Sequence, residues 1–134
     1  MKTDPKSIGE RSEGQIVAAF LRAGKVVLCP LGDNQRYDLV LDEGGKFVRV
    51  QCKTGRIEKG AIVFNTRSTN WYTHEGRDYR GQADLFAVYV PALDKVYTIP
   101  VDDVGVTACN LRLNPPRNGQ MRGVRLAENF EFKQ

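Results

Sequence analysis

Polar side chains of three different kinds come together in one short stretch of the sequence, "YDLVLDEGGKFVRVQCKTG" at residues 37–55. Apolar and polar residues alternate on both sides of its central Gly-Gly pair, which predicts a β-hairpin with a two-residue turn. If this pair is the centre of the turn, Asp38 lies opposite Gln51, and Lys53 follows two residues later on the same face. An acid, an amide and an amine are then within roughly 7 Å of one another.

This combination of groups suits the hydrolysis of phosphodiester bonds. Converging oxygen atoms of an acid and an amide are the hard ligands that Mg²⁺ prefers, with waters and a substrate phosphate completing its shell. A neighbouring ammonium group can stabilise the negative charge that develops on the phosphate, or hold the attacking water. The competing interpretation is a solvent-exposed polar stripe, since hairpins commonly have a charged outer face and Arg49 would continue the stripe.

A helix is predicted ahead of the hairpin. Ser7 and Glu10 fit an S-x-x-E capping box, and the residues that follow predict a helix that ends at Gly24 in the C′ position. Its apolar stripe is expected to consist of Val17, Phe20 and Leu21. Its polar face is expected to hold Arg11, Ser12, Gln15 and Arg22.

Two carboxylates of this helix, Glu10 and Glu13, project on its apolar side. A carboxylate that faces the core needs a partner, because burying an unpaired charge is costly. The capping box gives Glu10 a partner, whereas Glu13 has none within the helix. Glu13 is therefore the candidate for a second carboxylate of the metal site, and Glu10 is the alternative.

The rest of the chain predicts strands joined by turns. Strands are expected at 25–30, 61–66, 84–90 and 95–101. A loop or short helix is expected at 67–82, and prolines and glycines indicate a basic, irregular segment at 102–134 that ends in the strand-like "NFEF". Residues 1–134 are expected to form a single domain of the α/β class, with one helix ahead of a mixed sheet.

The composition narrows the possible functions. A net charge of +4 and a pI near 9.1 fit an anionic partner, of which nucleic acid is the commonest. The sequence has no run of 18 apolar residues and no apolar signal segment, which predicts an intracellular protein, cytoplasmic or nucleoid-associated, without a membrane partner. With His74 as the only histidine and three widely spaced cysteines, neither a zinc site nor a Ser-His or Cys-His hydrolase is expected.

Taken together, these motifs resemble those of the PD-(D/E)xK nuclease superfamily. The helix Glu, the Asp at the start of a strand and the x-Lys of "VQCK" come in the order of that superfamily. The sequence is most similar to small group I intron homing endonucleases of this fold, in which Gln takes the strand position usually held by Glu or Asp. The similarity covers "GERSEGQIVAAFLRAG", "CPLGDNQRYDLVLDEGGKFVRVQCKTGR" and "YRGQADLFAVYVPALDKVYTIPVD".

The resemblance implies a restriction-endonuclease-like core, with a helix, a three-stranded antiparallel meander and a central mixed sheet flanked by α-helices. It also implies a metal-dependent endonuclease of double-stranded DNA that assembles at least into a dimer. Carried over by position, it makes Glu13, Asp38 and Gln51 metal-site residues. The backbone carbonyl of Cys52 would be a further ligand, and Lys53 would be the catalytic lysine.

The sequence departs from the superfamily pattern at two positions. "YD" replaces the "PD" signature, and Gln51 replaces a carboxylate, so the site has one negative charge fewer. Fewer charges weaken the affinity for a cation, which favours one Mg²⁺ over two, and Mn²⁺ is expected to substitute for it.

Basic side chains outside the hairpin are candidates for contacts with DNA phosphates. They are Arg77 and Arg80 of "NWYTHEGRDYRG", and Arg112, Arg117, Arg122 and Arg125 of the C-terminal segment. The alternative is that the aromatic residues of the first stretch close the core and that the C-terminal segment is a solvated tail.

Two other functions are compatible with the same sequence. A Holliday-junction resolvase of the same fold would use the same site on branched DNA. A catalytically inactive DNA-binding protein would retain the fold with a degenerate site, and the replacement of a carboxylate by Gln51 is the residue change that motivates this alternative.

Overall fold

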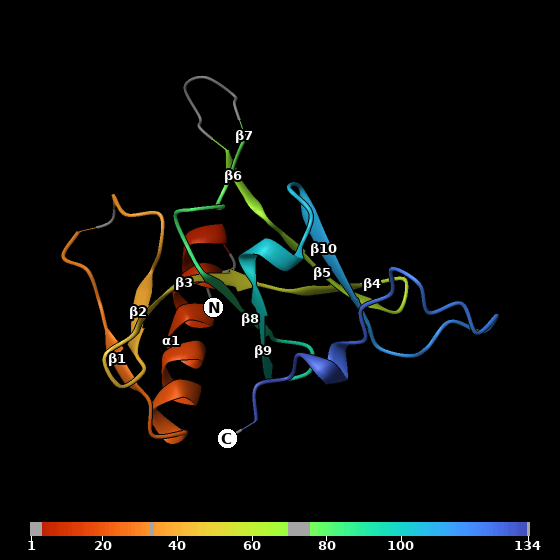
Figure 1. Ribbon diagram of the computed structural model, residues 1–134, viewed down its shortest axis with the longest axis horizontal. Coiled ribbons are helices and arrows are strands. Elements are labelled where there is room, and N and C mark those ends of the chain that lie inside the picture. The colour runs from red at the N-terminus through yellow and green to blue at the C-terminus, as the bar shows by residue number, and fades with distance from the viewer. Residues whose placement is uncertain (1–3, 33, 70–75, 134) are drawn as a thin grey trace.

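A five-stranded mixed β-sheet is the centre of the computed structural model, which describes residues 4–32, 34–69 and 76–133 (Figure 1). The strands lie in the order β1-β2-β3-β8-β9. Their bounds are β1 Val26–Leu28, β2 Leu39–Asp42, β3 Phe47–Thr54, β8 Leu85–Val90 and β9 Lys95–Pro100. β3 and β8 run parallel, whereas all other neighbours in this sheet are antiparallel. The predicted α/β fold, its meander and its mixed sheet are confirmed.

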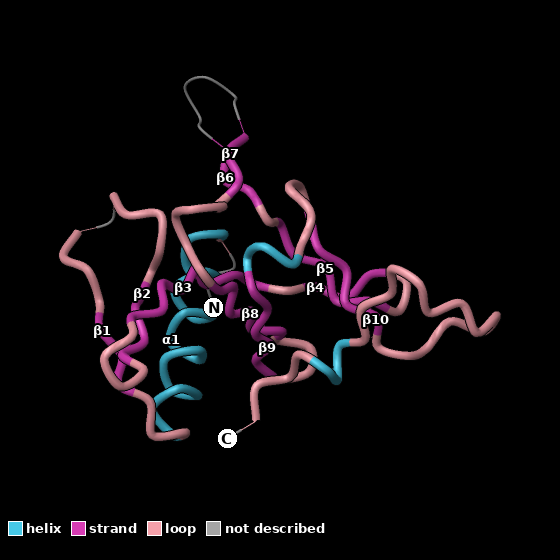
Figure 2. Tube along the Cα trace, in the orientation of Figure 1, coloured by secondary structure: helices cyan, strands magenta, loops and turns pink. Residues whose placement is uncertain are grey.

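Two smaller sheets accompany the central one. The first has the strand order β10-β5-β4, with bounds β4 Arg56–Glu58, β5 Ala61–Asn65 and β10 Ala108–Arg112. The second is a hairpin of β6 (Arg67–Thr69) and β7 (Gly76–Asp78), which projects from the body of the molecule (Figure 2). Two short 3₁₀ helices, η1 (Val101–Asp103) and η2 (Ala127–Asn129), lie in the C-terminal part of the chain.

The hairpin of β2 and β3 has the register expected from its sequence. Leu39 pairs with Val50, and Asp42 pairs with Phe47. Gly44 and Gly45 both have positive φ, 68° and 99°, which is the requirement of a type I′ turn and explains the Gly-Gly pair. The ladder ends at Leu39 and Val50, and the N–H of Asp38 donates to the carbonyl of Val50 at 2.8 Å, so the pairing of Asp38 with Gln51 stays a prediction.

Helix α1 (Pro5–Arg22) begins earlier than predicted. Its N-cap is Asp4, whose side chain accepts hydrogen bonds from the backbone N–H and the hydroxyl of Ser7. The predicted capping box of Ser7 and Glu10 is therefore wrong, because an acidic N-cap followed by a proline starts the helix one turn upstream. The predicted end is confirmed: Gly24 has a φ of 80° and donates its N–H to the carbonyl of Leu21.

The buried face of α1 also differs from the predicted stripe. Ser12, Ile16, Ala19 and Phe20 are the buried residues of the helix, whereas Leu21 is 56% exposed. Ser12 was expected on the polar face. It can be buried because its hydroxyl makes a hydrogen bond of 2.6 Å to the hydroxyl of Thr54 at the end of β3. This contact fixes the rotation of the helix over the sheet.

The two faces of the central sheet are covered by different elements. α1 covers one face, where Phe20 packs with Leu39 and Val50. On the other face β5 and β10 pack against β8, with Phe64 and Phe86 in edge-to-face contact at 5.6 Å between ring centroids. The expectation of α-helices on both sides therefore needs correction: within the described residues α1 is the only α-helix, and a small sheet covers the second face.

Gly55 marks the point at which the chain passes from the central sheet to the small one. A Cβ atom at this position would lie 2.9 Å from Val88 Cγ1, and 3.0 Å from methyl groups of Ile62 and Val90. The N–H of Gly55 donates to the carbonyl of Tyr89 at 2.8 Å. The absence of a side chain thus allows the close approach of the two sheets directly after Lys53.

Two segments of the second half differ from their predictions. The segment 67–82, expected as a loop or short helix, contains β6 and β7. The segment 102–134, expected to be irregular, contains β10, which pairs with β5 over its whole length. Trp71, Tyr72 and His74 lie outside the described residues. Among the described helices, none is long and apolar enough to cross a membrane.

Candidate active site

Asp38 lies one residue before β2, at the edge of the hydrogen-bonded hairpin. Its own N–H donates to the carbonyl of Val50 at 2.8 Å, and its Oδ2 accepts a hydrogen bond of 2.8 Å from the N–H of Cys52. Burial raises the pKa of Asp38, and the hydrogen bond from Cys52 and the charge of Lys53 only oppose this shift. The carboxylate is thus fixed in place and poorly solvated.

Gln51 and Lys53 project from β3 on the face opposite α1, because they alternate with Val50 and Cys52 of the helix-side core. The Nε2 atom of Gln51 donates to the carbonyl of Cys52 at 3.3 Å. The ammonium of Lys53 donates to the hydroxyl of Tyr79 at 3.2 Å. Both side chains are half-buried, so the pair is not part of a fully solvated stripe.

Glu13 reaches the same region from α1. It lines, together with Asp38, a cavity of about 190 Å³ whose other walls are Cys29, Pro30, Gly32, Gln35 and Tyr37. Burial raises the pKa of Glu13, and the negative charges of Asp38 and Glu10 raise it further. Glu10 itself is exposed and does not line this cavity, so the position of Glu13 fits the predicted role better.

The thiol of Cys52 is held in its neutral form. Burial raises its pKa well above the usual range, and the charges of Asp38 and Glu13 add to this shift. A thiol that stays protonated is a poor metal ligand, whereas the carbonyl of the same residue points to the amide of Gln51. The predicted oxygen donors are two carboxylates, one amide and one carbonyl. Of these residues Glu13 and Asp38 line the cavity of about 190 Å³, whereas Gln51 and Cys52 do not.

This set of donors fits a hard divalent cation. All four groups offer oxygen, which is what Mg²⁺ and Mn²⁺ prefer over nitrogen or sulfur. Within the described residues no group of three acidic, cysteine or histidine side chains converges, so the further donors would have to come from the Gln51 amide and the Cys52 carbonyl. Burial raises the pKa of both neighbouring carboxyls despite the charge of Lys53 near Asp38, and a cation between them would favour their charged forms.

None of the six arginines predicted to contact DNA lines the cavity at Asp38. Arg112 and Arg125 come together in a broad cavity of about 1050 Å³ on the outer face of the small sheet. The Arg125 guanidinium donates to the carbonyl of Asp103 at 2.6 Å. The remaining four, all exposed, are Arg77, Arg80, Arg117 and Arg122.

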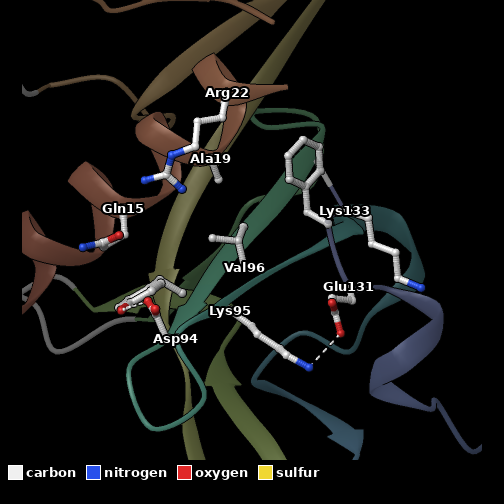
Figure 3. A pocket seen from close by; sticks show the side chains of 10 residues that line it. Gln15, Ala19, Arg22, Asp94, Lys95, Val96, Glu131 and Lys133 are labelled. Carbon is white, nitrogen blue, oxygen red and sulfur yellow. Dashed lines mark hydrogen bonds and ion pairs between the residues drawn. The ribbon is translucent and has the colours of Figure 1, made fainter. Parts of the chain in front are cut away.

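A further cavity of about 370 Å³ lies between α1, β9 and the C-terminal segment (Figure 3). Lys95 and Glu131 form an ion pair of 3.2 Å at its rim, and the N–H of Phe132 donates to the carbonyl of Val96. None of its lining residues belongs to the cavity at Asp38. It is where the C-terminal segment covers the edge of the central sheet, which protects β9 from pairing with another chain.

Sequence reasoning missed two residues beside the candidate site. Arg36 precedes Asp38 by two residues and packs on the ring of Tyr79, which in turn contacts Lys53. Tyr79 is one of the aromatic residues for which closing the core was the alternative, and at 4% exposure it belongs to the core. The contact between Lys53 and Tyr79 spans 26 residues of sequence, so no local pattern could indicate it.

Comparisons with known proteins agree with this geometry. The family model described as PD-(D/E)XK endonuclease matches residues 3–133. Among solved structures, that of a bacterial homing endonuclease, I-Ssp6803I, is similar, with a TM-score of 0.76 and 30% sequence identity. The similarity covers 96% of this chain and 89% of that one. No curated protein matches the sequence significantly.

Proposed function

The chain belongs to the PD-(D/E)XK endonuclease family, and from this premise we propose that it is a Mg²⁺-dependent enzyme that hydrolyses phosphodiester bonds in double-stranded DNA. The homing type is proposed because of the 30% identity to I-Ssp6803I. The observation that carries the proposal is the position of Glu13 and Asp38 at one cavity, beside the strand end that bears Gln51 and Lys53.

We assign the metal site to four oxygen donors: the carboxylates of Glu13 and Asp38, the amide oxygen of Gln51 and the carbonyl of Cys52. Asp38 is already fixed by the N–H of Cys52, so little ordering of the chain is needed. The two ends of the Gln51 amide are nearly alike in shape, and a half-turn brings its oxygen beside the Cys52 carbonyl. When bound, a divalent cation lowers the pKa of water and offsets negative charge on the phosphate.

Lys53 is assigned the role of the catalytic lysine. Its ammonium is a compact positive charge near Asp38, where it opposes the rise in the pKa of that carboxyl that burial causes. In that position it stabilises charge on the phosphate or orients the attacking water by donating a hydrogen bond. It cannot serve as a metal ligand while protonated, which separates its role from those of Asp38 and Gln51.

We propose a homo-oligomer, at least a dimer, as the cutting form. Each chain contributes one proposed site, and cleavage of both strands needs two sites in opposite orientation, which a two-fold axis provides. Phosphate contacts outside the site are proposed for basic side chains in β7, shortly after β7 and in the C-terminal segment. These are Arg77, Arg80, Arg112, Arg117, Arg122 and Arg125.

A cleavage assay tests the proposed function. Linear duplex libraries and a synthetic four-way junction are incubated with Mg²⁺, Mn²⁺ or EDTA, with Asp38→Ala as the control. We expect cleavage of duplex with either cation, none with EDTA, and none by the variant. Preference for the junction over every duplex would instead indicate a resolvase. DNA binding without cleavage under any metal condition would indicate an inactive DNA-binding protein.

A further inference from the structure

The ammonium of Lys53 is held by one aromatic side chain. Its Nζ donates to the hydroxyl of Tyr79 at 3.2 Å and lies 4.7 Å from the centroid of the same ring. A lysine ends in four rotatable bonds, and an exposed lysine samples many rotamers. Two contacts to one rigid group restrict the ammonium to a small volume beside Asp38, which is what a catalytic cation requires.

Tyr79 is rigid because it is fixed from several sides. Its side chain is 4% exposed and packs edge-on against Phe86, with 5.6 Å between ring centroids. Its carbonyl accepts hydrogen bonds from the N–H groups of Gln82 and Ala83, both at 3.0 Å. The phenol hydroxyl therefore has a fixed position within hydrogen-bonding distance of the Lys53 ammonium.

The guanidinium of Arg36 packs on the same ring. The guanidinium carbon lies 4.1 Å from the centroid of the Tyr79 ring, a cation–π distance. Its nitrogens donate to the side chains of Ser68 and Gln82, and to the carbonyl of Asp78 at 2.5 Å. One side chain thus connects the segment before Asp38 to β6, to β7 and to the turn that carries Tyr79.

We propose that Tyr79 is a positioning residue, which holds the Lys53 ammonium in its working place, and that Arg36 supports it by fixing the ring. This inference rests on the proposed role of Lys53. It differs from a purely structural role of Tyr79 in one respect. A core residue needs the ring alone, whereas a positioning residue needs the hydroxyl.

Tyr79→Phe separates these roles, because it keeps the ring and removes the hydroxyl. Tyr89→Phe is the matched control, since its hydroxyl bonds to Asp94 at 2.7 Å and lies outside the cavity at Asp38. We expect Tyr79→Phe to lower the single-turnover cleavage rate roughly 10- to 100-fold, the effect of losing a hydrogen bond to a charged group. DNA affinity should stay unchanged, Tm should fall by only a few degrees because the bond is also present without DNA, and the control should cleave like the wild type.

A double-mutant cycle tests whether the effect passes through Lys53. In the Lys53→Ala background the change Tyr79→Phe should cost nothing further, because the group to be positioned is gone. Full additivity of the two losses would overturn the inference, as would a wild-type cleavage rate in Tyr79→Phe. Arg36→Lys keeps the charge but loses the planar fork, and we expect a smaller loss of rate, in the same direction.

A second measurement is independent of cleavage. Side-chain ammonium signals of ¹⁵N-labelled protein are recorded, and the Lys53 signal is assigned by its loss in Lys53→Ala. In the wild type it should be protected from exchange with water, and Tyr79→Phe should remove this protection. An unchanged signal would overturn the inference. If the wild type cleaves no DNA, the proposed function fails. This measurement would still show whether the Tyr79 hydroxyl holds the Lys53 ammonium.

Discussion

Two aspartates flank β3 in equivalent positions, and their pKa values are shifted in opposite directions. Asp38 directly precedes β2 and Asp84 directly precedes β8, the two neighbours of β3 in the sheet. Each accepts a hydrogen bond of 2.8 Å from a backbone N–H of β3, Asp38 from Cys52 and Asp84 from Arg49. The backbone of β3 therefore makes the same kind of hydrogen bond to each of the two carboxylates.

The side chains around them differ. The Arg49 guanidinium donates to both oxygens of Asp84, at 3.1 and 3.0 Å, and this pairing lowers the pKa of Asp84. Among the described residues no guanidinium pairs with Asp38 in this way: burial raises the pKa of Asp38, and it shares a cavity with Glu13. The carboxylate of Asp84, which is paired with Arg49, joins the start of β8 to β3. The carboxylate of Asp38 is desolvated and lies next to a second acid, and both are features of a functional site.

The variants Asp38→Asn and Asp84→Asn are expected to differ most in their rate of DNA cleavage. Asp38→Asn removes one charge but keeps an oxygen that can accept from Cys52, and we expect the single-turnover rate to fall by at least about 10³-fold because a metal ligand is weakened. Asp84→Asn should change the rate by no more than about threefold. The rates are measured with saturating enzyme and Mg²⁺. Equal losses in both variants would show that Asp38 has no special role.

The next largest difference concerns stabilisation by cations. A cation that binds only the folded protein stabilises it by about 1.4 kcal/mol at ten times its Kd, which raises Tm by a few degrees. We expect this shift with Mg²⁺ or Mn²⁺ for the wild type and Asp84→Asn, and none for Asp38→Asn. Thermal denaturation without DNA measures it. A shift that survives in Asp38→Asn would place the cation elsewhere.

Without divalent cations the two variants should change stability in opposite directions. Asp84→Asn breaks a two-point ion pair at a partly exposed site, and we expect a loss of about 0.5–1 kcal/mol. Asp38→Asn removes a desolvated charge beside Glu13, so the free energy of unfolding should rise. Urea denaturation in EDTA gives both values. A destabilised Asp38→Asn protein would mean that the carboxylate is better solvated than its burial indicates.

The smallest difference is in the pH dependence of stability. The pKa of Asp84 is lowered by folding, so its contribution is present above about pH 3.9 and is lost as the pH falls below that value. The pKa values of Asp38 and Glu13 are raised, so their protonation favours the fold as the pH falls from 7 toward 4. We expect Asp38→Asn to reduce that gain and Asp84→Asn to reduce the loss at lower pH. Urea denaturation in EDTA from pH 7 down to about pH 2 measures both slopes, and identical slopes in both variants would contradict the assignment.

The sequence alone determined the local part of the candidate site. A Gly-Gly turn with alternating residues on both sides permits one register, because a slip by one residue would expose the apolar face. From that register we predicted that Asp38 lies near Gln51 and Lys53, and the N–H of Cys52, between those two residues, does donate to the Asp38 carboxylate. The helix end at Gly24 was likewise predictable, since a positive φ at C′ is a requirement of the chain itself.

Only the tertiary structure decided which face of α1 meets the sheet. Apolar residues occur on more than one side of this helix, and the contact of Ser12 with Thr54 selects the side that buries Phe20 and exposes Leu21. The same rotation brings Glu13 to the cavity at Asp38 and leaves Glu10 outside. Tyr79 and Arg36 depend on contacts between residues far apart in sequence, which no local pattern encodes. The sequence thus determined which groups are available, because turns and periodicity are local. Packing decided which of them meet, because that choice depends on surfaces that exist only in the folded chain.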